Sequence, residues 1–214
     1  MRGRLLTEFI GTFFLVLTIG MTVLIGTDFA PVAIGAVLVA LVYMGGHVSR
    51  AHYNPAVTLA MWMRGVTPTR EVGPYVVAQM LAACAAALVA FAVNDRPLQV
   101  MPNPETALVE FFLLELLFTF LLVLVILNVA TSRDLEGNEA YGVAIGFVVM
   151  GGAFAAGPIS GGAFNPAVAL GPVLVDLVVG DGASLGSLWV YLVATLAGAA
   201  GAAWVFPFQS PRDA

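Results

Sequence analysis

Residues 46–59 read GHVSRAHYNPAVTL, and residues 157–170 read GPISGGAFNPAVAL. The two stretches agree at seven of their fourteen positions, and each contains the tripeptide Asn-Pro-Ala, at 54–56 and at 165–167. One such tripeptide is a weak signal, because it arises by chance in many proteins. Two of them at corresponding places in a repeat indicate that both have the same structural role.

The repeat extends beyond these stretches. Val-Ala-Ile-Gly occurs at 32–35 and again 111 positions later at 143–146, and a Glu-x-x-x-Thr-Phe pattern begins at Glu8 and at Glu115. We therefore predict a single domain over 1–214, made of two repeats at about 1–94 and 105–208.

Composition places the chain in a membrane. Hydrophobic residues make up 60% of the sequence and charged residues 10%, and the mean hydropathy is +0.98, which no ordinary soluble domain reaches. Runs of roughly 20 apolar residues can span a bilayer. Six such runs lie at about 5–25, 31–49, 72–93, 108–130, 141–157 and 187–208.

Two shorter apolar stretches, about 54–63 and 165–179, begin at the Asn-Pro-Ala motifs and are too short or broken to span. Three spans in each half make the second half enter the membrane from the opposite face, which is an inverted repeat. The expected fold is an all-α membrane protein with six transmembrane helices and two re-entrant half-helices.

The Asn-Pro-Ala motif suits the start of a half-helix. Proline fits the first helical turn (Pro55 and Pro166, followed by Ala56 and Ala167), and the preceding Asn54 or Asn165 can cap the free N–H groups. Inversion brings the positive ends of two helix dipoles together at the centre. This field opposes cations, so a pore for neutral molecules is expected.

The loops before each asparagine should line the pore with backbone carbonyls, at Tyr53 in the first loop and at Gly161, Ala163 and Phe164 in the second. The other polar groups of these loops need partners inside the membrane. Glu8 and Glu115 are carboxylates within spans, where an unpaired charge is costly. We expect them to support the loops.

Charge indicates orientation and excludes other functions. Seven of the eight arginines fall on one side if the N-terminus is cytoplasmic, which fixes cytoplasmic N- and C-termini by the positive-inside rule. A basic footprint for nucleic acid is missing, as are a metal cluster and a nucleophile–base pair. We expect no enzyme activity, cofactor or metal, and the bilayer, water and solutes as partners.

These motifs, together with TEFIGTFFLV and WVYLVATLAGAA, resemble the aquaporin (major intrinsic protein) family over nearly the whole length. The resemblance implies a homotetramer with one pore per subunit and no catalysis, in this case most simply in a plasma (inner) membrane. It makes Asn54 and Asn165 the paired pore asparagines. It also makes His52 a pore-lining histidine, although His52 could instead brace its loop.

The resemblance further implies a selectivity filter at Ile34, Ala153, Gly162 and Val168. Water-selective members have an arginine where this chain has Val168, and an aromatic residue or histidine elsewhere in the ring. We therefore expect a wide apolar filter that passes water and small uncharged solutes. Candidates are glycerol, urea, hydrogen peroxide, ammonia and neutral metalloid hydroxides.

Several alternatives stay open at this stage. A strictly water-selective channel is the first, and a coupled secondary transporter is a further one, since inverted repeats also build transporters. A membrane structural protein lacks an interaction tail to support it. Arg50, where the family usually has glycine, could place a charge at the cytoplasmic mouth or extend to lipid headgroups.

Overall fold

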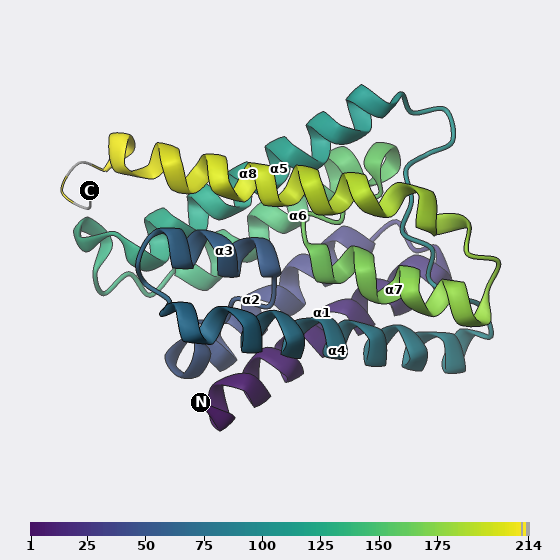
Figure 1. The fold of residues 1–214 in the computed structure, drawn as a ribbon, viewed down its shortest axis with the longest axis horizontal. Coiled ribbons are helices and arrows are strands. Elements are labelled where there is room, and N and C mark those ends of the chain that lie inside the picture. The colour runs from purple at the N-terminus through teal and green to yellow at the C-terminus, as the bar shows by residue number, and fades with distance from the viewer. Residues whose placement is uncertain (211, 213–214) are drawn as a thin grey trace.

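The computed structural model describes residues 1–210 and 212, so residues 211 and 213–214 of the predicted channel domain lie outside the described residues. Within the described part all regular elements are helical (Figure 1). The α-helices are α1 (Arg2–Ile25), α2 (Ala30–Ser49), α3 (Pro55–Met63), α4 (Thr69–Asn94), α5 (Leu108–Thr131), α6 (Tyr141–Ser160), α7 (Pro166–Val179) and α8 (Leu188–Gln209), with short 3-10 turns η1 (Arg133–Leu135) and η2 (Ala183–Ser187).

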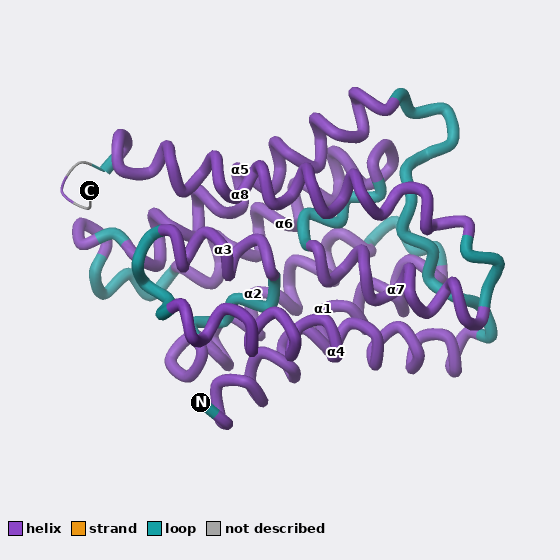
Figure 2. The backbone as a smooth tube through the Cα atoms, in the orientation of Figure 1, coloured by secondary structure: helices purple, strands orange, loops and turns teal. Residues whose placement is uncertain are grey.

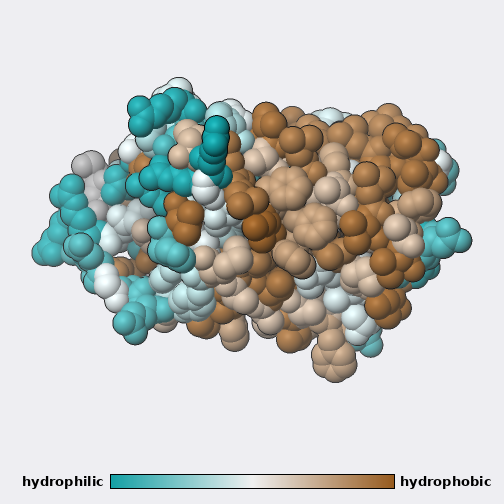
Figure 3. Space-filling model, turned by 90° about the horizontal axis from the view of Figure 1, so that it is seen from below, coloured by the Kyte–Doolittle hydropathy of each residue, from teal (hydrophilic) through white to brown (hydrophobic). Residues whose placement is uncertain are grey.

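Six of these helices are long and apolar enough to span a membrane, namely α1, α2, α4, α5, α6 and α8. The tube drawing shows them as long helical rods, with an extended loop between α4 and α5 (Figure 2). In the space-filling view, hydrophobic residues cover the middle of the molecule, and hydrophilic residues gather mainly at one end and more sparsely at the other (Figure 3). The predicted fold class, an all-α membrane protein, is confirmed.

The two shorter helices lie inside the bundle. α3 and α7 follow each other end to end across the middle of Figure 1, and their first residues face each other there. α3 packs against α4, α5 and α8, while α7 packs against α4 and α8. Neither crosses the whole bundle, as the sequence predicted for the two Asn-Pro-Ala stretches.

The start of α1 and the end of α8 lie at the same end of the bundle (Figure 1). We call this end the termini side and the other end the opposite side. On the termini side, Arg4 forms an ion pair of 2.7 Å with Glu71 of α4, and Arg212 pairs at 2.9 Å with Asp134. The second pair is well exposed, so we expect it to add little stability.

The crossing of α2 and α6 depends on two glycines. A Cβ atom at Gly146 would lie 2.5 Å from the carbonyl oxygen of Gly35, and one at Gly35 would lie 2.8 Å from that of Gly146. The two backbones therefore approach more closely than any side chain allows, as small residues permit in membrane helix pairs. These glycines are 111 positions apart and belong to the repeated Val-Ala-Ile-Gly.

This crossing gives the first prediction. Gly146→Ala should destabilise the protein by roughly 1–3 kcal/mol, because the added methyl group overpacks against backbone atoms that have little room to move. The measurement is the thermal unfolding midpoint in detergent. The control is Gly151→Ala on the same helix, where a Cβ meets nothing within 4 Å. Equal midpoints for the two variants would contradict the tight crossing.

Candidate functional site

Both asparagines of the motifs cap a half-helix. The side-chain oxygen of Asn54 accepts a hydrogen bond of 2.8 Å from the N–H of Ala56, and that of Asn165 accepts one of 2.9 Å from Ala167. Each asparagine has an extended backbone, with φ of −157°, as N-cap residues require. Pro55 and Pro166 have no N–H, so the N–H groups of Ala56 and Ala167 are the first donors of the two helices. The asparagine side chains satisfy both of them.

The same two amides join the halves of the chain. Asn54 Nδ2 donates to the carbonyl oxygen of Phe164, and Asn165 Nδ2 donates to that of Tyr53, each at 2.9 Å. Each bond therefore runs from one motif to the residue before the other motif. Because an amide nitrogen carries two hydrogens, one hydrogen of each asparagine remains to donate to a molecule in the pore.

A buried carboxylate lies behind the first loop. Glu8 has no exposed surface, and its oxygens accept hydrogen bonds from the N–H groups of His52 (3.0 Å) and Tyr53 (2.7 Å). The side chains of Ser49 (2.6 Å) and Gln79 (2.8 Å) also donate to it. Glu8 thus provides an acceptor for loop N–H groups that point away from the pore.

The second loop has the same arrangement. Glu115 is fully buried and accepts from the N–H groups of Ala163 (3.1 Å) and Phe164 (2.8 Å) and from the hydroxyl of Ser160 (2.7 Å). The two carboxylates therefore contact equivalent atoms of the two loops, immediately before Asn54 and Asn165.

The sequence interpretation did not identify several residues of this support. Ser49 and Ser160 are among the seven identities of the repeat, which is a signal that could have indicated them. Tyr75 and Tyr191 donate to the carbonyls of Ser49 (3.1 Å) and Ser160 (2.5 Å). Each tyrosine begins a Tyr-x-Val-Ala, at 75–78 and at 191–194, which is a second repeated signal that could have indicated them.

A cavity of about 610 Å³ lies within the bundle beside both motifs. Asn54 and Asn165 line it, as do the four predicted filter residues Ile34, Ala153, Gly162 and Val168. The structure therefore brings together residues from α2, α6, the second loop and α7.

The loop residues named as pore-lining also border this cavity: His52, Tyr53, Gly161, Ala163 and Phe164. The two aromatic side chains are held by packing contacts elsewhere. The Tyr53 hydroxyl donates to the carbonyl of Leu41 at 2.9 Å, and the Phe164 ring packs on Phe118 with centroids 5.5 Å apart. Their carbonyl oxygens are the acceptors of the asparagine bonds described above.

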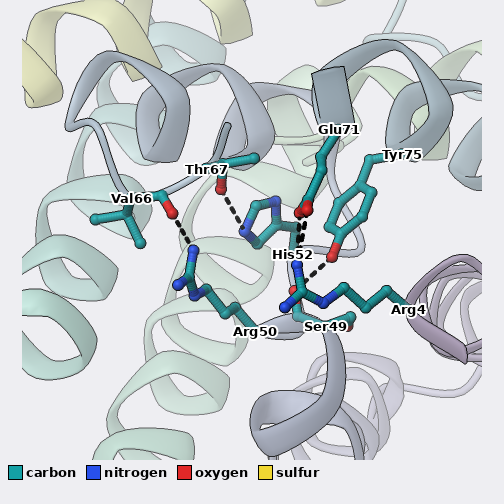
Figure 4. A network of polar contacts seen from close by, with 8 residues as sticks. All are labelled: Arg4, Ser49, Arg50, His52, Val66, Thr67, Glu71 and Tyr75. Carbon is teal, nitrogen blue, oxygen red and sulfur yellow. Dashed lines mark hydrogen bonds and ion pairs between the residues drawn. The ribbon is translucent and has the colours of Figure 1, made fainter. Parts of the chain in front are cut away.

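His52 lies on the termini side of the motifs and is buried. Its ring nitrogens lie 3.1 Å from the hydroxyl of Thr58 and 3.5 Å from that of Thr67, and its ring packs on Tyr75 with centroids 5.2 Å apart. Figure 4 shows it pointing toward Thr67 from the first loop. His52 therefore both borders the cavity and braces its loop.

The sequence model of the Major intrinsic protein family matches residues 1–206. The chain belongs to this family. Aquaporin NIP1-4 of Oryza sativa subsp. japonica is 39% identical, covering 94% of this chain and 75% of the relative. Nodulin-26 of Glycine max is 34% identical, covering 95% of this chain and 76% of the relative.

A solved structure supports the fold independently. The X-ray structure of the aquaglyceroporin from Plasmodium falciparum superposes with a TM-score of 0.84, at 21% identity, over 98% of this chain and 97% of that chain. Family membership makes this protein a multi-pass membrane channel for water and small solutes. Members of the family are passive channels, so the chain is not an enzyme.

The second prediction concerns the carboxylates. Glu8→Ala should lower stability by roughly 1–3 kcal/mol or more, because it leaves two loop N–H groups and a glutamine without their buried acceptor. Glu115→Ala should act likewise. The measurement is the yield of monodisperse protein and its unfolding midpoint in detergent.

Glu105→Ala is the control, since Glu105 is an exposed glutamate in the connection between α4 and α5. If Glu8→Ala and Glu115→Ala matched this control in yield, midpoint and conductance, the supporting role would be refuted.

Proposed function

We propose that this channel conducts water and also larger uncharged solutes, with urea and glycerol as the reference cases. The observation that carries the proposal is the ring of Ile34, Ala153, Gly162 and Val168 along the cavity. None of these side chains has a hydrogen-bond donor, and two of them are no larger than a methyl group.

Val168 is the deciding member of this ring. It follows Asn-Pro-Ala directly, so it lies in the first turn of α7, and it is nearly buried at 4% exposure. A branched apolar side chain occupies the place where water-selective relatives in the family have arginine. Arginine would add a long side chain, a permanent charge and a fork of five donors. Its replacement leaves the ring wider and less polar.

Exclusion of protons then depends on the centre of the pore. The N-terminal ends of α3 and α7 face each other there, each with a partial positive charge of roughly half a unit. The two free asparagine hydrogens at this point orient a passing water through its oxygen. Both effects oppose a cation and a proton transferred along a file of waters.

Orientation and assembly complete the proposal. We place the termini side in the cytoplasm, because seven of eight arginines belong to it. The fold then consists of one channel domain of two inverted repeats, assembled as a homotetramer in a plasma membrane. Large apolar side chains on the outer helix faces, such as Leu81, Phe147 and Trp204, suit contact with lipid or with a second subunit.

The third prediction tests the filter. In proteoliposomes, Val168→Arg should reduce urea and glycerol permeation by about tenfold or more, a barrier increase of roughly 1.4 kcal/mol, and reduce water permeation much less. The reason is steric, since water passes a narrowed ring in single file. Stopped-flow light scattering with each solute measures both rates.

Val168→Met separates bulk from charge, because methionine is long, flexible and uncharged. It should reduce solute permeation less than arginine does. A folded tetramer of Val168→Arg with the wild-type solute profile would remove Val168 from the filter. Water permeation alone in the wild-type protein would favour the strictly water-selective alternative.

A further inference from the structure

Arg50 occupies a backbone position that glycine suits better. It ends α2 with φ of 70°, in the left-handed region, and its N–H binds the carbonyl of Gly46. The equivalent residue of the second half is Gly161, with φ of 88° and the same bond to Gly157. A side chain in this conformation carries a steric penalty that glycine avoids. The next residue, Ala51, is also left-handed, with φ of 51°, so the case for Arg50 rests on the contacts of its side chain.

The side chain extends across the termini side of the first loop. Its guanidinium donates to the carbonyl oxygen of Val66, in the connection between α3 and α4 (Figure 4). This partner is a neutral carbonyl, so the positive charge of Arg50 is not compensated by the bond. The contact favours the first of the two sequence interpretations, a charge at the mouth, because the guanidinium is bound to the chain's own loop.

Arg50 also lines a second cavity, of about 420 Å³. The second cavity continues the first along three helices. On each helix one residue lines the first cavity, and the residue four positions later, about one helical turn on, lines the second. These pairs are Val42 and Gly46 on α2, Val57 and Met61 on α3, and Ile126 and Ala130 on α5. The second cavity is thus the mouth of the pore on the termini side.

The loop shows the same succession, with Ala51 lining the first cavity and Arg50 the second. Among the described residues that line either cavity, Arg50 is the only arginine or lysine, whereas Asp28 lines the first cavity and Glu139 the second. A molecule that crosses the channel therefore passes one fixed positive side chain, and this side chain stands at the termini-side mouth.

We propose that Arg50 adds a second barrier to cations and protons in this channel, at the termini-side mouth, where its charge replaces the one absent from the ring around Val168 and acts together with the half-helix ends at the centre. This inference rests on the proposed function, a pore wide enough for solutes of urea size. A wide apolar ring discriminates poorly by size between a neutral solute and a cation of similar shape. A unit charge beside the path discriminates between them directly.

Urea and guanidinium provide a direct test, because they are planar, of similar size, and differ by one charge. The readout is the ratio of guanidinium to urea permeability in proteoliposomes, with proton flux relative to water flux as a second ratio. Arg50→Gln removes the charge and Arg50→Lys keeps it, and both retain a side chain at the same left-handed position. Arg70→Gln is the control, an exposed termini-side arginine that lines neither cavity.

Arg50→Gln should raise the guanidinium-to-urea ratio by about tenfold, while Arg50→Lys and Arg70→Gln stay near wild type. An unchanged ratio in Arg50→Gln would overturn the proposal. An equal rise of urea and guanidinium permeability in both Arg50→Gln and Arg50→Lys would also overturn it. That result would show that the contact with Val66 narrows the mouth by its bulk and that the charge has no effect.

Failure of the proposed function would look different. If urea permeates neither the wild-type protein nor the variants, broad selectivity is refuted. The proton-to-water ratio then still decides the role of Arg50, which is supported by a rise in Arg50→Gln alone and overturned by an unchanged ratio.

Discussion

Backbone N–H groups buried at membrane depth must find acceptors within the protein, since lipid offers none. The two re-entrant loops meet this constraint through Glu8 and Glu115, whose carboxylates accept the N–H groups just before each asparagine. With these donors satisfied on the outer side, the carbonyls of the same residues are free to point inward. The position of the motif asparagines, the facing ends of α3 and α7, and the path of the pore all depend on this arrangement.

The two halves use this common frame differently. On the termini side the loop has His52, which borders the cavity and contacts the hydroxyls of Thr58 and Thr67. On the opposite side the equivalent of His52 is Ala163, which borders the cavity with a methyl group. The frame that holds the backbone is thus shared, while the side chains that a permeating molecule meets differ between the two ends.

The sequence predicted the elements of this fold closely, because hydrophobic run length and proline position are local signals. The predicted starts at Asn54 and Asn165 are the observed N-caps of α3 and α7. The sequence did not predict contacts between segments that are far apart in the chain. Gln79 is conspicuous as an amide within an apolar span, but its bonds to Glu8 and to Thr58 join segments that the sequence does not place together. The direction of the Tyr53 ring, toward Leu41, likewise follows only from the packing of α1 and α2 around it.

The reciprocal bonds between Asn54 and Phe164 and between Asn165 and Tyr53 have a consequence for how such a chain can arise. Each half supplies the acceptor that the other half's asparagine needs, so a half on its own buries an amide and a carbonyl without partners. An ancestral protein of half this length would therefore have had to pair two copies in opposite membrane orientations. Fusing them into one chain fixes the ratio and the orientation of the two copies, and it frees each copy to diverge, as Arg50 and Gly161 have done.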